Sequence, residues 1–405
     1  MAENLEKKAP NVRFKGFTYD WELQKFNNVF NSISNNSLSR NDLSYEKGSV
    51  INIHYGDLLT KFDEYLDIQN TNLPKIIDDD KATKASRAKL MDGDIIIADT
   101  AEDETAGKCV EIGNLTDSVV VSGLHTMAQR PKFEFGKRYL GVYMNSVSYH
   151  KQLLPLMQGI KVISISKTAI ASTIIVYPQK IEEQNKIGAI FKIISNLLTL
   201  YQRKIGLLQQ LKKAMLQRLF PDTDTYPKLR FGGFSGPWEQ RKLRDVIDSE
   251  IKGKAKATML GDKSVYLETG YLNGGIKQRV NSPTNVDEDD VLILWDGSKA
   301  GKLYHGFSGA LGSTLKAFKP KFSGMFLYQY MSKDQDKIYQ QYRTPNIPHV
   351  VKNFTDKYLV NLPNLQEQKQ IGIFFNQLDT LITLQQRKLD NMNKLKKFML
   401  QQMFI

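Results

Sequence analysis

The chain has 405 residues and a formal net charge of +13, and 41% of its residues are hydrophobic. That length suggests two or more domains of about 100–200 residues each, and the composition excludes wholesale disorder. The positive surplus favours a polyanionic partner, most commonly a nucleic acid.

The cellular compartment can be inferred from what the sequence lacks. The single cysteine, Cys109, excludes a disulfide within the chain and a cysteine-rich zinc site. No apolar run approaches the roughly 18–20 residues that span a bilayer. The opening MAENLEKKAP contains no apolar stretch typical of a secretory signal. We therefore expect a cytoplasmic protein whose residues 1–9 form a flexible N-terminus.

The first recognisable element is a motif that occurs twice. PNVRFKGFTYDWE begins at Pro10, and PKLRFGGFSGPWE begins at Pro227. An internal repeat of this kind decides the fold, since both copies are expected to form the same element. We expect Arg13 and Arg230 to dock each domain on a helix or to hold its edge rather than to contact bases.

Each motif is followed by a variable region with fainter matches. An apolar β-rich run occurs at 95–97 and again at 291–294. Each run is followed by an Asp and then by Ala-Gly-Lys, ending at Lys108 and Lys302. Short β-like runs among Gly and Asp turns predict an α+β domain at 10–180 and another at 227–362. The glycines would let the two lysines approach DNA, or they would simply form a turn after a core strand.

Two long helices are the strongest prediction. The block from Glu183 to Phe220 aligns without a gap with the block from Glu367 to Phe404, and helices are expected at 181–220 and 363–405. Their apolar positions alternate in steps of four and three, a coiled-coil period, so two matching stripes can pack on each other. The residues predicted to pack helix on helix are Ile187, Phe191, Ile194, Leu198, Tyr201, Ile205 and Leu208 in the first copy, and Ile371, Phe375, Leu378, Ile382, Leu389 and Met392 in the second.

A short Pro- and Asp-rich linker at 221–226 ends the first long helix. The chain therefore repeats one order: motif, variable domain, long helix. The order of these duplicated motifs resembles the specificity subunits of type I restriction–modification systems, over nearly the whole chain from Pro10 to Phe404.

The resemblance implies a fold and a function. Two target-recognition domains would each read half of a bipartite double-stranded DNA target, and the two long helices would pack antiparallel as a spacer. The subunit would not be an enzyme and would bind no cofactor. It would assemble in a prokaryotic cytoplasm with two methyltransferase subunits and with restriction subunits, which would hold S-adenosylmethionine, ATP and Mg²⁺. Because the two variable regions differ, the target would be asymmetric.

Motifs for catalysis are missing or incomplete. GSKAGKL at Gly297 falls one residue short of a phosphate-binding Walker loop and ends in Leu303 instead of Ser or Thr. No Pro-Pro pair is present for an amino-methyltransferase motif, and the five histidines show no metal-ligand spacing. A nuclease pattern of Pro221-Asp222 with Glu250 and Lys252 matches only formally. We therefore predict no catalytic residues and no metal site.

Contacts to DNA need cations for phosphates and amide or aromatic groups for base edges. The alternative for each cation is a solvated surface charge. The alternative for the whole chain is a coiled-coil scaffold protein with two protein- or RNA-binding heads. The predicted DNA-binding residues are Lys81, Lys84, Arg87, Lys89, Lys108, Arg130 and Lys132 in the first domain, and Lys252, Lys254, Lys256, Tyr271, Asn273, Lys277, Arg279, Lys299 and Lys302 in the second.

Overall fold

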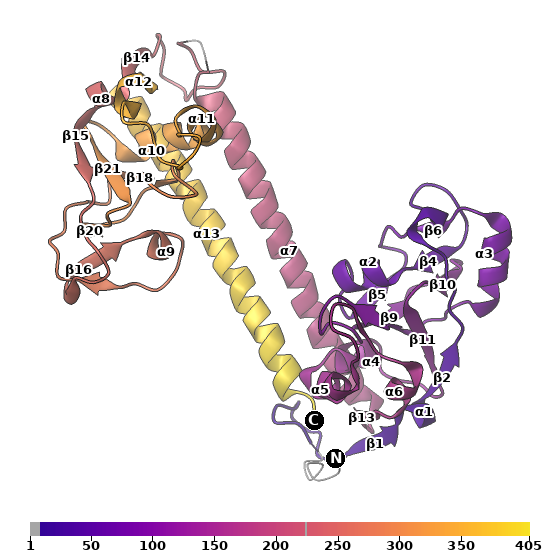
Figure 1. The fold of residues 1–405 in the computed structure, drawn as a ribbon. Coiled ribbons are helices and arrows are strands. Elements are labelled where there is room, and N and C mark those ends of the chain that lie inside the picture. Colours follow the sequence, from indigo (N-terminus) through magenta and orange to yellow (C-terminus); the bar gives the residue numbers. More distant parts are fainter. Residues whose placement is uncertain (1–8, 223–224) are drawn as a thin grey trace. The chain divides into compact units, whose positions relative to one another are not determined.

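The structure is a computed structural model that describes residues 9–222 and 225–405. The predicted flexible segment 1–9 therefore lies almost wholly outside the described residues, as does the middle of the predicted linker 221–226. The chain divides into two compact units. Unit 1 comprises Met1–Tyr201 with Lys388–Ile405, and unit 2 comprises Gln202–Arg387. Each long helix thus begins in one unit and ends in the other, so each unit contains parts of both (Figure 1).

Unit 1 combines sheets with short helices and one end of each long helix. Its sheets are β1 (Trp21–Lys25) with β13 (Ile174–Pro178); β2 (Phe30–Ile33), β11 (Thr126–Pro131), β7 (Ile95–Ala98), β9 (Cys109–Gly113) and β5 (Tyr65–Asp67) in that order; β10 (Val120–Ser122), β4 (Ile51–Ile53), β6 (Lys75–Ile76) and β3 (Leu43–Ser44); and β12 (Ile163–Ser164) with β8 (Thr100–Ala101). Its helices are α1 (Phe26–Val29), α2 (Tyr55–Thr60), α3 (Asp79–Ala85), α4 (Tyr139–Met144), α5 (Val147–Leu153), α6 (Lys167–Ala171) and the start of α7 (Ile181–Leu219).

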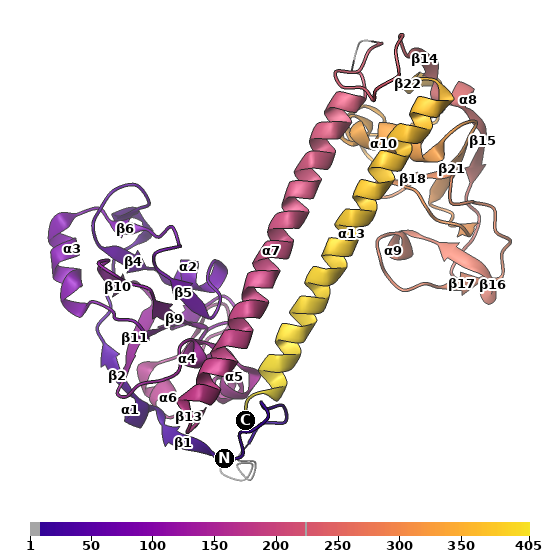
Figure 2. The ribbon, with the colours of Figure 1, turned by 180° about the vertical axis from the view of Figure 1, so that it is seen from behind.

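Unit 2 repeats the opening motif and the long-helix ends of unit 1, which together are called the frame. The region between the motif and the helix, called the filling, differs between the units. Its sheets are β14 (Glu239–Lys242) with β22 (Leu359–Leu362); β15 (Ile247–Lys252), β21 (Leu315–Pro320), β18 (Val291–Leu294) and β19 (Leu303–Tyr304); and β17 (Arg279–Val280), β16 (Leu260–Leu267) and β20 (Ala310–Leu311). Its helices are α8 (Leu243–Val246), α9 (Thr269–Leu272), α10 (Gly324–Lys333), α11 (Gln335–Gln341), α12 (Phe354–Lys357) and the start of α13 (Leu365–Gln402). Seen from behind in Figure 2, β14 and β22 lie beside the beginning of α13.

The long helices pair antiparallel within each unit. In unit 1, Phe191 of α7 contacts Phe404 just beyond α13, and Ser195 accepts a hydrogen bond from Lys396 at 3.1 Å. Residues later in α7 therefore contact residues earlier in α13, which is the pattern of an antiparallel pair. In unit 2 the same relation joins Phe375 to Phe220, and Asp379 to Lys212.

Burial along the helices follows the heptad pattern. The predicted packing positions that are buried are Ile187, Phe191, Ile194, Leu198, Ile205, Ile371, Phe375 and Leu378, whereas Tyr201, Leu208, Ile382, Leu389 and Met392 are half-buried. The fold is therefore α+β, with two mixed domains joined by two long helices that pair antiparallel within each unit.

The repeated phenylalanine at the end of each helix block closes an aromatic cluster. Phe404 packs against Trp21, Tyr139, Tyr143 and Phe191, with ring centroids 5.9–6.3 Å apart. The matching cluster in unit 2 consists of Phe220 with Trp238, Phe326, Tyr330 and Phe375 at 5.4–6.2 Å. Burying such rings contributes most of the free energy that holds a helix end on a domain.

The repeated arginines dock each opening motif on the start of a long helix. Arg13 forms two hydrogen bonds with Glu183, at 2.6 and 2.9 Å, and the Glu183 side chain is buried. Arg230 repeats this with Glu367 at 2.8 and 2.7 Å. The hydrogen bond that Arg13 donates to Glu183 raises the pKa of the Arg13 guanidinium, so the pair stays charged. This agrees with the structural role expected for the two arginines.

A glycine in each long helix lets the domain approach the helix backbone. A Cβ on Gly188 would lie 2.1 Å from the carbonyl oxygen of Lys137, and one on Gly372 would lie 3.0 Å from the Cβ of Met325. The repeated Ile-Gly pair is therefore explained by packing, because only glycine permits the closer of these two approaches.

Candidate nucleic-acid interface

The clearest basic site of unit 1 lies beside α3. Lys81, Lys84 and Arg87 line one cavity of about 660 Å³, together with the polar segment 34–38. The chain turns into α3 at Asp78, whose side chain accepts a hydrogen bond from the backbone N–H of Lys81 at 2.8 Å. This cap fixes the helix start, so the cations are presented at a defined spacing along one short helix and the turn that follows it.

The cations at this cavity differ in how free they are. The Lys81 ammonium pairs with Asp42 at 2.6 Å, and this hydrogen bond is the main reason that the pKa of Asp42 falls to about 2. Among the described residues, the side chains of Lys84, Arg87 and Lys89 have no hydrogen-bond or ion-pair partner. Because they are exposed and unpaired, these three side chains are available for phosphate oxygens.

Three other predicted DNA contacts of unit 1 are held by internal partners. Arg130 makes a bidentate pair with the buried Asp94, at 2.9 and 2.7 Å, and this raises the pKa of its guanidinium. Lys132 donates to the carbonyl of Asn27 at 2.5 Å. Lys108 donates to the carbonyl of Leu59 at 2.9 Å, and burial lowers its pKa. These hydrogen bonds connect segments that are distant in the sequence, so the three side chains stabilise the fold of the domain.

The Ala-Gly-Lys segments form tight turns after core strands. Gly107 has φ +89° and donates its N–H to Ala98, and Gly301 has φ +94° and donates to Leu294. A left-handed backbone favours glycine at both positions. In unit 2 the lysine of this turn, Lys302, bonds the amide oxygen of Asn273 and lies 5.2 Å from the ring centroid of Tyr304. Lys302, Asn273 and Tyr304 thus form one polar cluster.

The remaining predicted residues of unit 2 lie on its outer strands and loops. Lys252 ends β15, and Lys254 and Lys256 follow it with exposed side chains. Arg279 pairs with Asp262, and Tyr271 packs edge-on against Phe307 at 5.8 Å. Lys277 and Lys299 are exposed, and their side chains have no hydrogen-bond or ion-pair partner within the described part of the chain. The exposed cations of unit 2 are thus spread over several loops, whereas Lys81, Lys84 and Arg87 of unit 1 line one cavity.

One polar segment was not singled out from the sequence. The residues NNS at 35–37 line the same cavity as Lys84 and Arg87. Asn36 donates to the side chain of Asn52 at 2.7 Å and to the carbonyl of Ser122 at 2.9 Å, which fixes its orientation. Amide and hydroxyl groups beside phosphate-binding cations are suited to base edges. The only signal in the sequence was the density of Asn and Ser in this run.

No group of three or more His, Cys, Asp or Glu side chains that could hold a metal occurs within residues 9–222 and 225–405. Asp222 pairs with Lys333 at 2.7 Å and Glu250 pairs with Lys316, so both acids of the formal nuclease pattern are held by lysines. Cys109 is buried, which raises its pKa. No described helix is long and apolar enough to cross a membrane.

Comparisons with known proteins agree with this geometry. Residues 236–394 match the family model of the type I restriction modification DNA specificity domain. The MjaVIII specificity subunit of a type I restriction enzyme from Methanocaldococcus jannaschii is 34% identical over 178 residues, which span 41% of this chain and 42% of that relative. The MjaX specificity subunit from the same organism is 22% identical over 93% of this chain and 91% of its own length.

Solved structures show the same fold along the whole chain. A crystal structure of a type I restriction–modification S subunit from M. genitalium aligns with a TM-score of 0.67 at 13% identity, covering 98% of this chain and 99% of that one. A structure from work on assembly and conformational transition of the type I R-M system aligns with a TM-score of 0.52 at 17% identity, covering 94% and 96%. Residues 236–394 thus match the type I restriction modification DNA specificity domain, and over nearly its whole length the chain is similar to a type I specificity subunit and shares the fold of solved S subunits.

Proposed function

We propose that this chain is the non-catalytic DNA-specificity subunit of a type I restriction–modification complex. The proposal rests on one observation: the two units share the same frame, whereas their fillings differ. Both units use the same Arg–Glu pair, the same aromatic cluster and the same glycine turn. The comparisons favour this function over the scaffold alternative.

The fillings differ where bases would be read. Unit 1 adds a four-stranded sheet and a cationic cavity beside α3, whereas unit 2 adds the three-stranded sheet β17-β16-β20 with dispersed lysines. Two modules with unlike side chains at their surfaces select unlike base sequences. The proposed target is therefore asymmetric and bipartite, and each unit reads one half.

Exposed leucines on the long helices support docking of partner subunits. Leu200 is 57% exposed and its repeat mate Leu384 is 46% exposed, and both lie outside the seam between the helices. Leu211 and its mate Leu395 are each 42% exposed. Large apolar side chains kept on the surface in both copies indicate an interface. We propose that each copy docks one methyltransferase subunit, so that two bind per chain.

The test combines the chain with its methyltransferase partner and S-adenosylmethionine. The complex should methylate one interrupted, asymmetric sequence, and the chain alone should transfer no methyl groups, since the cofactors belong to the partners in this proposal. Exchanging residues 10–180 for the same region of another specificity subunit should change only one half of the target. Methylation by the chain alone, or a target unaffected by the exchange, would contradict the proposal.

Docking is tested by stoichiometry. Leu200→Glu and Leu384→Glu should each reduce the number of methyltransferase subunits per chain from two to one, and the double variant should bind none. Lys151→Gln, an exposed change on α5, serves as the control. Two partners retained by the double variant would place the interface elsewhere.

A further inference from the structure

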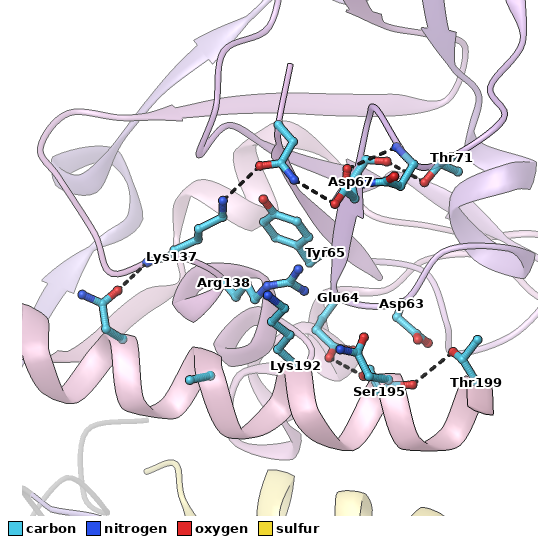
Figure 3. A pocket seen from close by; sticks show the side chains of 15 residues that line it. Asp63, Glu64, Tyr65, Asp67, Thr71, Lys137, Arg138, Lys192, Ser195 and Thr199 are labelled. Carbon is cyan, nitrogen blue, oxygen red and sulfur yellow. Dashed lines mark hydrogen bonds between the residues drawn. The ribbon is translucent and has the colours of Figure 1, made fainter. Parts of the chain in front are cut away.

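A second cavity of unit 1 lies between the first domain and α7, and the predicted DNA-binding residues do not line it. It has a volume of about 650 Å³ and is lined by polar groups from β5, from the loop before α4 and from α7. Figure 3 shows Lys137 and Arg138 entering it from the domain, while Lys192 extends from α7 toward Arg138. Three cations therefore converge on one end of this cavity.

The side chains of these three cations form no ion pair with a carboxylate of the described residues. Lys192 has no hydrogen-bond or ion-pair partner among the described residues. The Arg138 guanidinium lies 3.6 Å from the ring centroid of Tyr65 and makes no ion pair with a described carboxylate, although Asp67 and Glu111 are close enough to interact with it electrostatically. Lys137 donates to the neutral amide oxygen of Asn114 at 3.1 Å. Cations gathered without a direct ion pair repel one another, and an anion placed among them would relieve this repulsion.

The carboxylates of the cavity are engaged elsewhere. Glu64 accepts hydrogen bonds from Lys396 at 2.8 Å and from Ser195 at 2.9 Å. Asp63 lies 3.9 Å from the same ammonium. Asp67 accepts from the amide of Asn114 at 2.8 Å. Lys396 thus offsets part of the negative charge at the acidic end of the cavity.

The backbone around Arg138 is held in an unfavourable conformation. Arg138 has φ +71°, in the left-handed region, and its N–H donates to Glu111 at 2.5 Å. The close approach at Gly188 presses this segment onto α7, and Lys192 is four residues further along the same helix face. A strained residue that the surrounding structure fixes in place is typical of a binding site.

The repeat shows that packing does not require these charges. The same approach to α13 at Gly372 is made by Met325, which occupies the position of Arg138, preceded by Gly324 in place of Lys137. The repeat mate of Lys192 is Asn376. Since unit 2 builds the same junction with no cation at these positions, the three cations of unit 1 are not explained by the fold.

We propose that the cationic end of this cavity binds a phosphate group. Arg138 would present its planar fork to two phosphate oxygens, and Lys137 and Lys192 would flank it with ammonium groups. The group could be a backbone phosphate of DNA or a free phosphate. This site goes beyond the proposed function, since it lies apart from the cavity at α3 and its existence does not require that the chain confer sequence specificity.

The first arm of the test measures binding of inorganic phosphate to the full chain by calorimetry, with chloride at equal ionic strength as the reference. Wild-type protein should bind phosphate saturably. Lys192→Gln should weaken binding at least fivefold, and the double variant with Arg138→Asn should abolish it; asparagine is chosen because it tolerates positive φ. The control Lys151→Gln, which removes an exposed cation of the same unit, should bind as wild type does.

The second arm measures affinity for duplex DNA against salt concentration, with the methyltransferase partner present. If the phosphate belongs to DNA, Lys192→Gln should reduce the slope of log affinity against log salt by about 0.9, on target and non-target duplexes alike. An unchanged slope together with phosphate binding in the first arm would assign the site to a free phosphate. If Lys192→Gln matches Lys151→Gln in both arms, the proposal is wrong. Sequence-specific methylation would not decide this point, so the two proposals can fail separately.

Discussion

Removing the aromatic ring of Phe404 should loosen the end of α13 from unit 1. The ring is 3% exposed and contacts four aromatic side chains with centroids 5.9–6.3 Å away. A buried Phe→Ala change costs about 3–5 kcal/mol, because it loses the transfer free energy of the ring and leaves a cavity. We expect about 4 kcal/mol for Phe404→Ala. For a unit of this size that corresponds to a fall in Tm of roughly 8–16 °C.

The repeat supplies an internal control for this experiment. Phe220→Ala makes the matching change in unit 2, where Phe220 is 1% exposed. Hydrogen exchange followed by peptide mass spectrometry reports the two units separately. Phe404→Ala should speed exchange in peptides of unit 1 around Trp21 and α4, and Phe220→Ala should do so around Trp238 and α10.

A surface phenylalanine on the same helix completes the comparison. Phe398 is 51% exposed, so Phe398→Ala should change the free energy of unfolding by no more than about 0.5 kcal/mol. A loss below about 1 kcal/mol for Phe404→Ala, or a loss for Phe398→Ala as large, would refute the view that the aromatic cluster anchors the helix.

Three further outcomes follow from the contacts. Exchanging Lys84 and Arg87 together for Gln should lower the salt slope of DNA binding by about 1.8, measured by fluorescence anisotropy, if each cation meets one phosphate; an unchanged slope would remove them from the interface. Gly188→Ala should cost several kcal/mol in urea unfolding, whereas Gly206→Ala on α7, where a Cβ would meet nothing within 4 Å, should stabilise by up to about 1 kcal/mol; equal effects would contradict the packing argument. Burial raises the pKa of Glu111 from 4.5 to about 7, so the folded state binds a proton that the unfolded state has released, and the free energy of unfolding should fall by about 3 kcal/mol as pH rises from 4.5 to 7. Glu111→Gln should make the urea midpoint independent of pH between pH 5 and 8, and a wild-type midpoint that rises with pH would contradict this sign.

The repeat made much of the frame predictable. Two copies of an arginine in the opening motif indicated docking on a helix or at a domain edge, and the structure joins Arg13 to Glu183 and Arg230 to Glu367. The heptad period likewise identified the buried seam. Such features depend on positions that recur, and recurrence is visible in one sequence.

The state of each surface cation was not predictable. Arg130 and Lys84 look alike in sequence, yet Arg130 is held by Asp94, which lies just before strand β7, while Lys84 has no side-chain partner among the described residues. Pairings of this kind depend on tertiary contacts between distant segments. The cavity at Arg138 was missed for the same reason, since its cations come from a loop and from α7.

The polar contacts between the two long helices differ between the two copies of the repeat. Lys212 pairs with Asp379 at 2.6 Å in unit 2. In unit 1 their repeat mates are Lys396 and Ser195, and the missing carboxylate is supplied by Glu64 from the domain. Comparison of the two copies shows that Ser195 stands where the second copy has Asp379, but only the fold shows that Glu64 supplies the carboxylate.

In each unit the opening motif contacts the end of a long helix. A short linker joins the two segments in unit 2, whereas in unit 1 they come from opposite ends of the chain. In unit 2 the N–H of Leu229 donates to the carbonyl of Arg218 at 2.9 Å, across the linker 221–226. In unit 1 the N–H of Val12 donates to Gln402 at the same distance, although the two residues lie at opposite ends of the chain. The end of α7 packs in unit 2 and the end of α13 packs in unit 1. A protease cut within 221–226 would therefore yield two fragments that stay associated, because each contributes a helix end to the core of the other unit.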